Sequence, residues 1–158
     1  MKSFVSALKR AAVSGSLASV SSTFALFHRG VRDCRSAIAP VNAVSHWIWK
    51  DKALRQHDTS VRYSLAGYCI HHLASIFWAV AYEHLAFRKG AAPNKKEALA
   101  SAATVAALAC AVDMRCTPER LTPGFERRLS KKSLFTVYVA FGVGLALHTL
   151  LSTKSRDR

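Results

Sequence analysis

The stretch "SLFTVYVAFGVGLALHTLL" (residues 133–151) decides the fold class, because it contains no Asp, Glu, Lys or Arg. Apolar side chains occur on all sides of its helical wheel, so a helix formed from it has no face suited to water. A helix needs about 20 residues to cross the hydrocarbon core of a bilayer, at ~1.5 Å of rise per residue. The stretch therefore predicts a membrane-spanning helix.

Working outward from this stretch, we find three more windows that are nearly free of charge, with basic segments between them. A soluble helical bundle with unusually apolar helices is the alternative, but such a bundle spreads its charges along one face of every helix. Two of the windows are short and rich in Ser or Ala, and we expect them to span by packing against the others. The sequence thus predicts one all-α integral membrane bundle (1–158) of four transmembrane helices, with spans at about 11–27, 63–87, 97–112 and 133–151.

The chain is strongly basic, with 23 Lys and Arg against nine Asp and Glu and a net charge of +14. These cations flank the apolar windows, where they meet anionic lipid headgroups. A nucleic-acid partner would also favour such charge, but no recognition helix or RNA-binding motif is present. We therefore expect lipid, a partner helix or a second copy of the chain as partners, and no nucleic acid. Thirteen basic residues on one side against ten on the other leave the orientation open.

The first connection carries "APVNAVSHWIWKDKALR" (residues 39–55), which is too long for a tight hairpin. Pro40 favours a turn, and the following residues predict a short interfacial helix near 42–54. Trp47 and Trp49 beside basic residues are typical of anchors at headgroup level. A partner-binding or substrate-gating segment is the alternative.

The last connection carries "TPERLTPGFERRLS" (residues 117–130), which predicts two short surface turns. Thr117 and Thr122 each precede a proline and are expected to cap these turns. Glu119 and Glu126 are expected to pair with nearby arginines and to have no catalytic role.

Four cysteines are present, and no Cys-x-x-Cys spacing indicates a zinc or thiol-redox motif. Cys34 and Cys116 fall in the two connections on one side of the predicted bundle. They can pair if that side is oxidising, and otherwise the four cysteines are unrelated free thiols.

Small residues recur four apart in the first window, at Gly15, Ser19 and Thr23. Ser14, Ala18 and Ser22 lie beside them, and the last window adds Ala140 and Gly144. Such stripes allow helix backbones to approach closely in lipid, so we expect a compact bundle.

Titratable groups interrupt the second window, "GYCIHHLASIFWAVAYEHL" (residues 67–85). His71, His72 and Glu83 form the candidate intramembrane polar site, because ionisable groups in lipid are costly and often functional. The histidines are read either as neutral groups bonded to Ser hydroxyls or as part of a proton or ion pathway. Haem or metal ligation is disfavoured, since neighbouring side chains point about 100° apart, and we expect no metal and no cofactor. At least one histidine should meet a polar group within residues 14–23, while Glu83 should reach the interface.

The segments "APVNAVSHWIW", "GYCIHHLASIFWAVAYEHL" and "PERLTPGFERRLS" together resemble a group of small proteobacterial inner-membrane proteins of unknown activity. More distantly, the second segment is similar to the YagU-type membrane proteins. The resemblance implies a multi-pass protein of the bacterial inner membrane and implies no catalytic residue.

The sequence favours a small polytopic inner-membrane protein with a structural or accessory role. The alternative is a small transporter or proton-coupled pathway that uses the polar residues of the second span. No nucleophile–base or metal constellation is visible, so we do not expect an enzyme or any catalytic residue. A polar cavity reaching His71 or His72 would favour the transporter, and a dry, fully packed bundle would favour the structural role.

Overall fold

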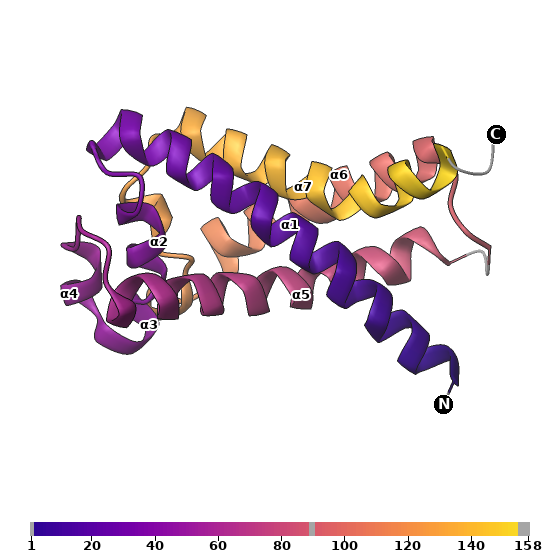
Figure 1. Cartoon of the computed structure of the whole chain (residues 1–158), viewed down its shortest axis with the longest axis horizontal. Coiled ribbons are helices and arrows are strands. Elements are labelled where there is room, and N and C mark those ends of the chain that lie inside the picture. Colours follow the sequence, from indigo (N-terminus) through magenta and orange to yellow (C-terminus); the bar gives the residue numbers. More distant parts are fainter. Residues whose placement is uncertain (1, 89–90, 155–158) are drawn as a thin grey trace.

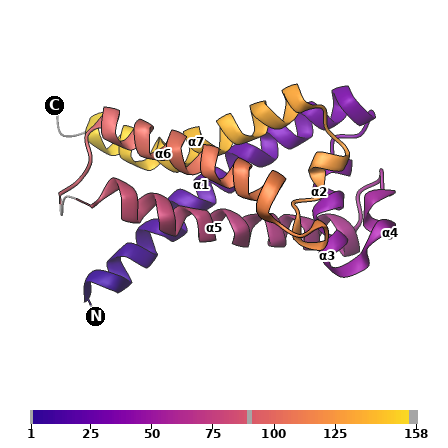
Figure 2. The ribbon, with the colours of Figure 1, turned by 180° about the vertical axis from the view of Figure 1, so that it is seen from behind.

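The computed structural model describes residues 2–88 and 91–154, which contain helices and no strand (Figure 1). The four long helices are α1 (Lys2–Cys34), α5 (Ala66–Ala86), α6 (Lys95–Ala111) and α7 (Lys131–Lys154). They run antiparallel in succession, so the start of α1 and the end of α7 lie at the same end of the bundle (Figures 1 and 2). The predicted all-helical fold is confirmed.

Short elements lie in the two connections at the opposite end. The first connection contains α2 (Ala39–Val44), α3 (His46–Trp49) and α4 (Asp51–Leu54), and the last contains the 3₁₀ turns η3 (Glu119–Leu121) and η4 (Phe125–Arg127). Two π-helical turns, η1 (Val61–Leu65) and η2 (Val112–Cys116), lengthen α5 at its start and α6 at its end.

Three helices among the described residues are long and apolar enough to cross a membrane. They are Val61–Ala86, Lys95–Cys116 and Lys131–Ser152, and each includes one of the predicted windows or nearly all of it. Helix α1 is not among them, although its 33 residues are more than long enough. Its many serines and its basic ends lower its hydropathy, so the first predicted span does not share the apolar character of the other three.

Helix α1 nevertheless holds the bundle together, since it packs against both α5 and α7 (Figure 1). The predicted small-residue stripe forms this contact. A Cβ atom at Gly15 would lie 2.6 Å from the Cα of Ile76 on α5, and one at Gly144 on α7 would lie 2.5 Å from the Cα of Ala18. Backbones therefore touch at both interfaces, which confirms the close packing expected from the sequence.

Polar side chains join the last turns of α1 to the start of α7. The guanidinium of Arg29 donates to Thr136 Oγ1 over 2.7 Å, and the backbone N–H of Ser130 donates to Asp33 Oδ2 over 2.7 Å. The hydrogen bond from Ser130 is the main reason that the pKa of Asp33 lies below its usual range. Asp33 thus caps α7 from another helix.

The first connection differs from the prediction of one surface helix over residues 42–54. The chain forms three short helices instead, and all six residues of α2 are buried. The reason is Asn42, whose polar side chain is satisfied inside the protein. Its Oδ1 accepts from Ser64 Oγ over 2.7 Å, and its Nδ2 donates to the carbonyl of Asp58 over 3.0 Å. Asn42 therefore holds α2 as a buried cap on the bundle.

The last connection has the two predicted turns, but the threonines do not cap them. The turns begin after Pro118 and Gly124, and Thr122 Oγ1 donates to the carbonyl of Glu119 instead. Arg127 lies 2.8 Å from a carboxylate oxygen of Glu119 and 3.8 Å from one of Glu126, so the predicted ion pairs are confirmed.

The four cysteines are free thiols. Cys34 Sγ donates to the carbonyl of Gly30 over 3.2 Å, and Cys116 is exposed.

Replacing Gly144 by Ala should destabilise the bundle, because its new methyl group would meet the backbone of Ala18. Overpacking of this kind costs about 1–3 kcal/mol. Thermal unfolding in detergent should show a lower Tm for Gly144→Ala, whereas the exposed neighbour Val143 should tolerate Val143→Ala. Equal Tm values for the two variants would contradict the close contact of α1 with α7.

Asp33→Ala should cost about 1 kcal/mol at neutral pH, as loss of a cap does. Because folding lowers the pKa of Asp33, this stabilisation is full above the unfolded pKa of about 3.9 and disappears as the pH falls through the folded value. Unfolding curves for the wild type and the variant should therefore converge in acid. A difference that is constant between pH 7 and pH 3 would show that the charge of Asp33 contributes nothing.

Candidate functional site

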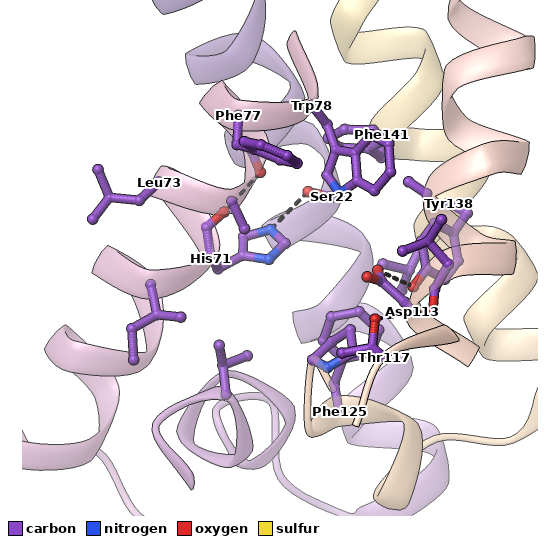
Figure 3. A pocket seen from close by; sticks show the side chains of 18 of the residues that line it. Ser22, His71, Leu73, Phe77, Trp78, Asp113, Thr117, Phe125, Tyr138 and Phe141 are labelled. Carbon is purple, nitrogen blue, oxygen red and sulfur yellow. Dashed lines mark hydrogen bonds between the residues drawn. The ribbon is translucent and has the colours of Figure 1, made fainter. Parts of the chain in front are cut away.

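His71 on α5 points into the bundle and meets α1 (Figure 3). Its Nε2 lies 2.8 Å from Ser22 Oγ, one of the hydroxyls in the stripe of α1. This confirms the prediction that a histidine of the second window meets a polar group within residues 14–23. In lipid such a contact matters, because the surroundings offer no other hydrogen bond.

The hydrogen-bond network assigns the tautomer of His71. The single proton of the Ser22 hydroxyl points to the carbonyl of Ala18, 2.7 Å away. Ser22 Oγ can therefore only accept from His71, so Nε2 carries the proton. In a neutral imidazole the other nitrogen, Nδ1, is then an acceptor.

His72 lies on a different face of α5. Its ring packs beside that of Tyr68, with centroids 5.7 Å apart, and its Nδ1 is buried without a hydrogen-bond partner in the described part of the chain. The two histidines therefore do not act as a pair.

Asp113 and Tyr138 face His71 from the other side of the interior (Figure 3). The Tyr138 hydroxyl on α7 donates to Asp113 Oδ2 over 2.8 Å. Asp113 belongs to η2, the turn that continues α6 beyond the predicted window.

A cavity of about 470 Å³ separates these two polar groups. This volume is within the range of small-molecule sites, which is roughly 300–1,000 Å³. Its wall is mostly apolar, and its aromatic residues are Trp47, Phe77, Trp78, Phe125, Tyr138 and Phe141. The rings of Phe125 and His71 pack edge-to-face at one corner of this cavity, with their centroids 6.3 Å apart.

The cavity is polar at one end and apolar at the other. His71 and Phe77 are six residues apart on α5, which corresponds to about 9 Å along the helix. The polar groups therefore lie toward the buried cap formed by α2, and Phe77, Trp78 and Phe141 lie toward the middle of the bundle. Phe77 is 67% exposed, so the apolar end meets the outer surface of α5.

Glu83 forms a separate site at the other end of α5. Its carboxylate accepts from Arg10 Nε over 3.0 Å and from Ser14 Oγ over 2.9 Å, both on α1. The guanidinium of Arg10 also lies 4.3 Å from the ring centroid of Phe87. Glu83 is 5% exposed, so its side chain is buried against α1, where Arg10 pairs with it. That Glu83 lies near the membrane interface stays a prediction.

The structure does not bring Glu83 together with His71. Twelve residues of α5 separate them, which is about 18 Å, and α1 is in backbone contact with α5 between them at Gly15. Of the three candidate residues, only His71 lines the cavity of about 470 Å³.

The two tryptophans of the first connection have different surroundings. Trp47 lines the cavity and donates its indole N–H to the carbonyl of Thr122 over 2.8 Å. Trp49 packs edge-to-face on Tyr63, with Arg62 6.0 Å from its ring centroid. Their depth in a membrane stays a prediction, and Trp49 fits an interfacial anchor better because its N–H is not donated within the described protein.

No three His, Cys, Asp or Glu side chains come together as metal ligands within residues 2–88 and 91–154. Comparison with protein families, curated proteins and solved structures found no match to this chain.

Sequence reasoning missed Asp113 because it follows the last apolar residue of the third window and was assigned to a connection. One signal was available: Tyr138 lies within an otherwise apolar helix, and a phenol there needs a hydrogen-bond partner. Asp113 directly follows a neighbouring predicted span on the same side of the bundle, so it was the carboxylate nearest to a span end there.

The contact of Ser22 with His71 should show measurable coupling. In a double-mutant cycle with Ser22→Ala and His71→Leu, we expect a coupling energy of about 0.6 kcal/mol, and below about 2 kcal/mol, as for other interhelical bonds in membranes. Chemical unfolding in mixed micelles gives the four values needed. Additive losses would show that the two side chains do not interact.

Replacing Arg10 should destabilise the protein more than replacing Glu83. Arg10→Leu leaves a buried carboxylate without its cation, a change that costs about 3–5 kcal/mol for fully buried pairs and less here, since Arg10 is one-third exposed. Glu83→Gln leaves no buried charge and should cost less. The double variant Arg10→Leu/Glu83→Leu should recover stability, and a loss equal to the sum of the single variants would contradict this account.

Proposed function

We propose that the protein is a multi-pass integral membrane protein that binds an amphipathic molecule in the cavity beside His71. All four long helices cross the bilayer in this proposal, including α1. The 33 residues of α1 correspond to about 50 Å, and its polar groups are turned toward α5 and α7. Its exposed side chains include Val13, Val20 and Phe24, which suit contact with lipid.

The bacterial inner membrane is the proposed location, in keeping with the resemblance described above. The net charge of +14 supports a membrane whose headgroups are anionic.

The observation that supports ligand binding is the cavity itself. It has the size of a small-molecule site, a mainly aromatic and aliphatic wall, and a few polar groups gathered at one end. An amphipathic molecule from the bilayer has the same distribution of polar and apolar surface. A structural or accessory role, which the sequence favoured, needs no such cavity.

A continuous proton pathway along α5 has less support. The Gly15 contact of α1 with α5 lies between His71 and Glu83, and Glu83 is engaged by Arg10 and Ser14. The polar residues of the second span therefore form two separate sites.

The four-span arrangement predicts that reporters fused after Lys95 and after Arg158 give the same sidedness. A third reporter, inserted after Asp58 in the first connection, should give the opposite one. Agreement of the reporters at 58 and 95 would mean that α5 does not cross the membrane, and the four-span proposal would then fail.

Ligand binding can be tested by tryptophan fluorescence, because Trp78 lines the cavity and Trp49 does not. In nanodiscs, a brominated alkyl amphiphile should quench a variant that keeps only Trp78 in a saturable manner. A variant that keeps only Trp49 should show a linear, partition-limited response. Ala74→Phe, which places a ring in the cavity, should abolish the saturable component, and the exposed Val80→Phe on the same helix is the matched control.

Linear quenching of Trp78 in both the parent and the Ala74→Phe variant would contradict ligand binding. It would leave the structural role as the better account.

A further inference from the structure

Asp113 has no cation beside it, although cations are abundant in this chain. Within the described residues, no Lys, Arg or His nitrogen lies within 4.0 Å of its carboxylate, and its recorded partner is the Tyr138 hydroxyl. The chain has 23 Lys and Arg against nine Asp and Glu. An acidic side chain without a counter-ion in a mainly apolar cavity is therefore unexpected, since an unpaired charge is costly to bury.

Two arginines of the neighbouring connection, Arg127 and Arg128, are engaged elsewhere. Arg127 pairs with Glu119 and Glu126, and Arg128 donates to the carbonyl of Leu54 and contacts the His57 ring at 2.8 Å. Neither guanidinium is directed to Asp113, so the protein leaves this position open to a cation from outside.

The cavity lacks free hydroxyl donors for a ligand. All four hydroxyl groups that line it donate to protein oxygens: Ser22 to Ala18, Ser75 to His71, Thr117 to Val112, and Tyr138 to Asp113. The Trp47 indole N–H is also donated, to Thr122. Apart from the Trp78 indole N–H, for which no partner is seen in the described part of the chain, the polar groups that remain on the wall are acceptors, namely the Asp113 carboxylate and the Nδ1 of His71.

We infer that the ligand is an amphipathic amine, bound in its protonated form. This inference rests on the proposed function and names the class of ligand. The ammonium group donates to the Asp113 carboxylate on one wall and to His71 Nδ1 on the other, which face each other in Figure 3. The apolar body extends toward Phe77, Trp78 and Phe141, and the surrounding rings of Phe125 and Tyr138 offer π-faces to the cation.

Such an amine has two sources, a free lipophilic amine or the amino headgroup of a phospholipid. Both present N–H donors on a positively charged nitrogen, so Asp113 can accept from either. In the phospholipid, a phosphate and a glycerol lie between this nitrogen and the acyl chains.

The test compares a brominated alkylamine with the brominated alcohol of the same chain length, using the Trp78 variant in phosphatidylcholine nanodiscs. This lipid has no N–H donor and no net charge. We expect the amine to bind at least about tenfold more tightly than the alcohol. Asp113→Asn should remove this preference while leaving the affinity for the alcohol unchanged, and Asp33→Asn, outside the cavity, should leave both unchanged.

A second set of nanodiscs containing phosphatidylethanolamine distinguishes the sources. Weaker binding of the amine in these discs, but not in the Asp113→Asn variant, identifies the phospholipid headgroup as a competitor. Unchanged binding identifies a free amine as the ligand.

Equal affinities for amine and alcohol, or a preference that survives Asp113→Asn, would overturn the inference and leave the cavity as a site for neutral amphiphiles. Absence of saturable quenching by either probe would instead overturn the proposed function.

Discussion

A lipid environment offers no hydrogen bonds, and in the proposed membrane bundle this constraint explains why α1 packs closely against both α5 and α7. The other long helices are mainly apolar, yet they carry polar groups that need partners. Helix α1 supplies these partners along its length: Arg10 and Ser14 for Glu83, Ser22 for His71, Arg29 for Thr136, and Asp33 for the N–H of Ser130. Its small residues bring the backbones close enough for these short side chains to reach.

The need of each helix for polar partners also determined which helices could be predicted from the sequence. Uncharged windows revealed α5, α6 and α7, since a run without charge is a local signal that needs no neighbours. The small-residue stripe that includes Gly15 and Ser22 could also be predicted from the sequence, because its members recur four apart and residues four apart share a helix face. The serines of α1 supply hydrogen bonds to neighbouring helices, but they also reduce its hydropathy. The part of α1 that packs best therefore resembles a membrane-spanning segment least.

The remaining features depend on contacts between distant residues, which a single sequence does not display. In the sequence, Asn42 resembles an ordinary loop residue, because its hydrogen-bond partners, Ser64 and the carbonyl of Asp58, are distant along the chain. Glu83 was assigned to the interface by its position near a helix end, and only the tertiary structure places Arg10 beside it. Asp113 enters the bundle because a π-turn extends α6 by a few residues, and no propensity rule predicts that extension.

The contacts of α1 with α5 and α7 also have a consequence for biogenesis. Helix α1 is synthesised before α5 and α7, the helices that cover its buried hydroxyls. A nascent chain that ends before α7 leaves Arg29 and Asp33 without their partners and one side of the small-residue stripe uncovered. The contacts of α1 are therefore completed only after α7 is made.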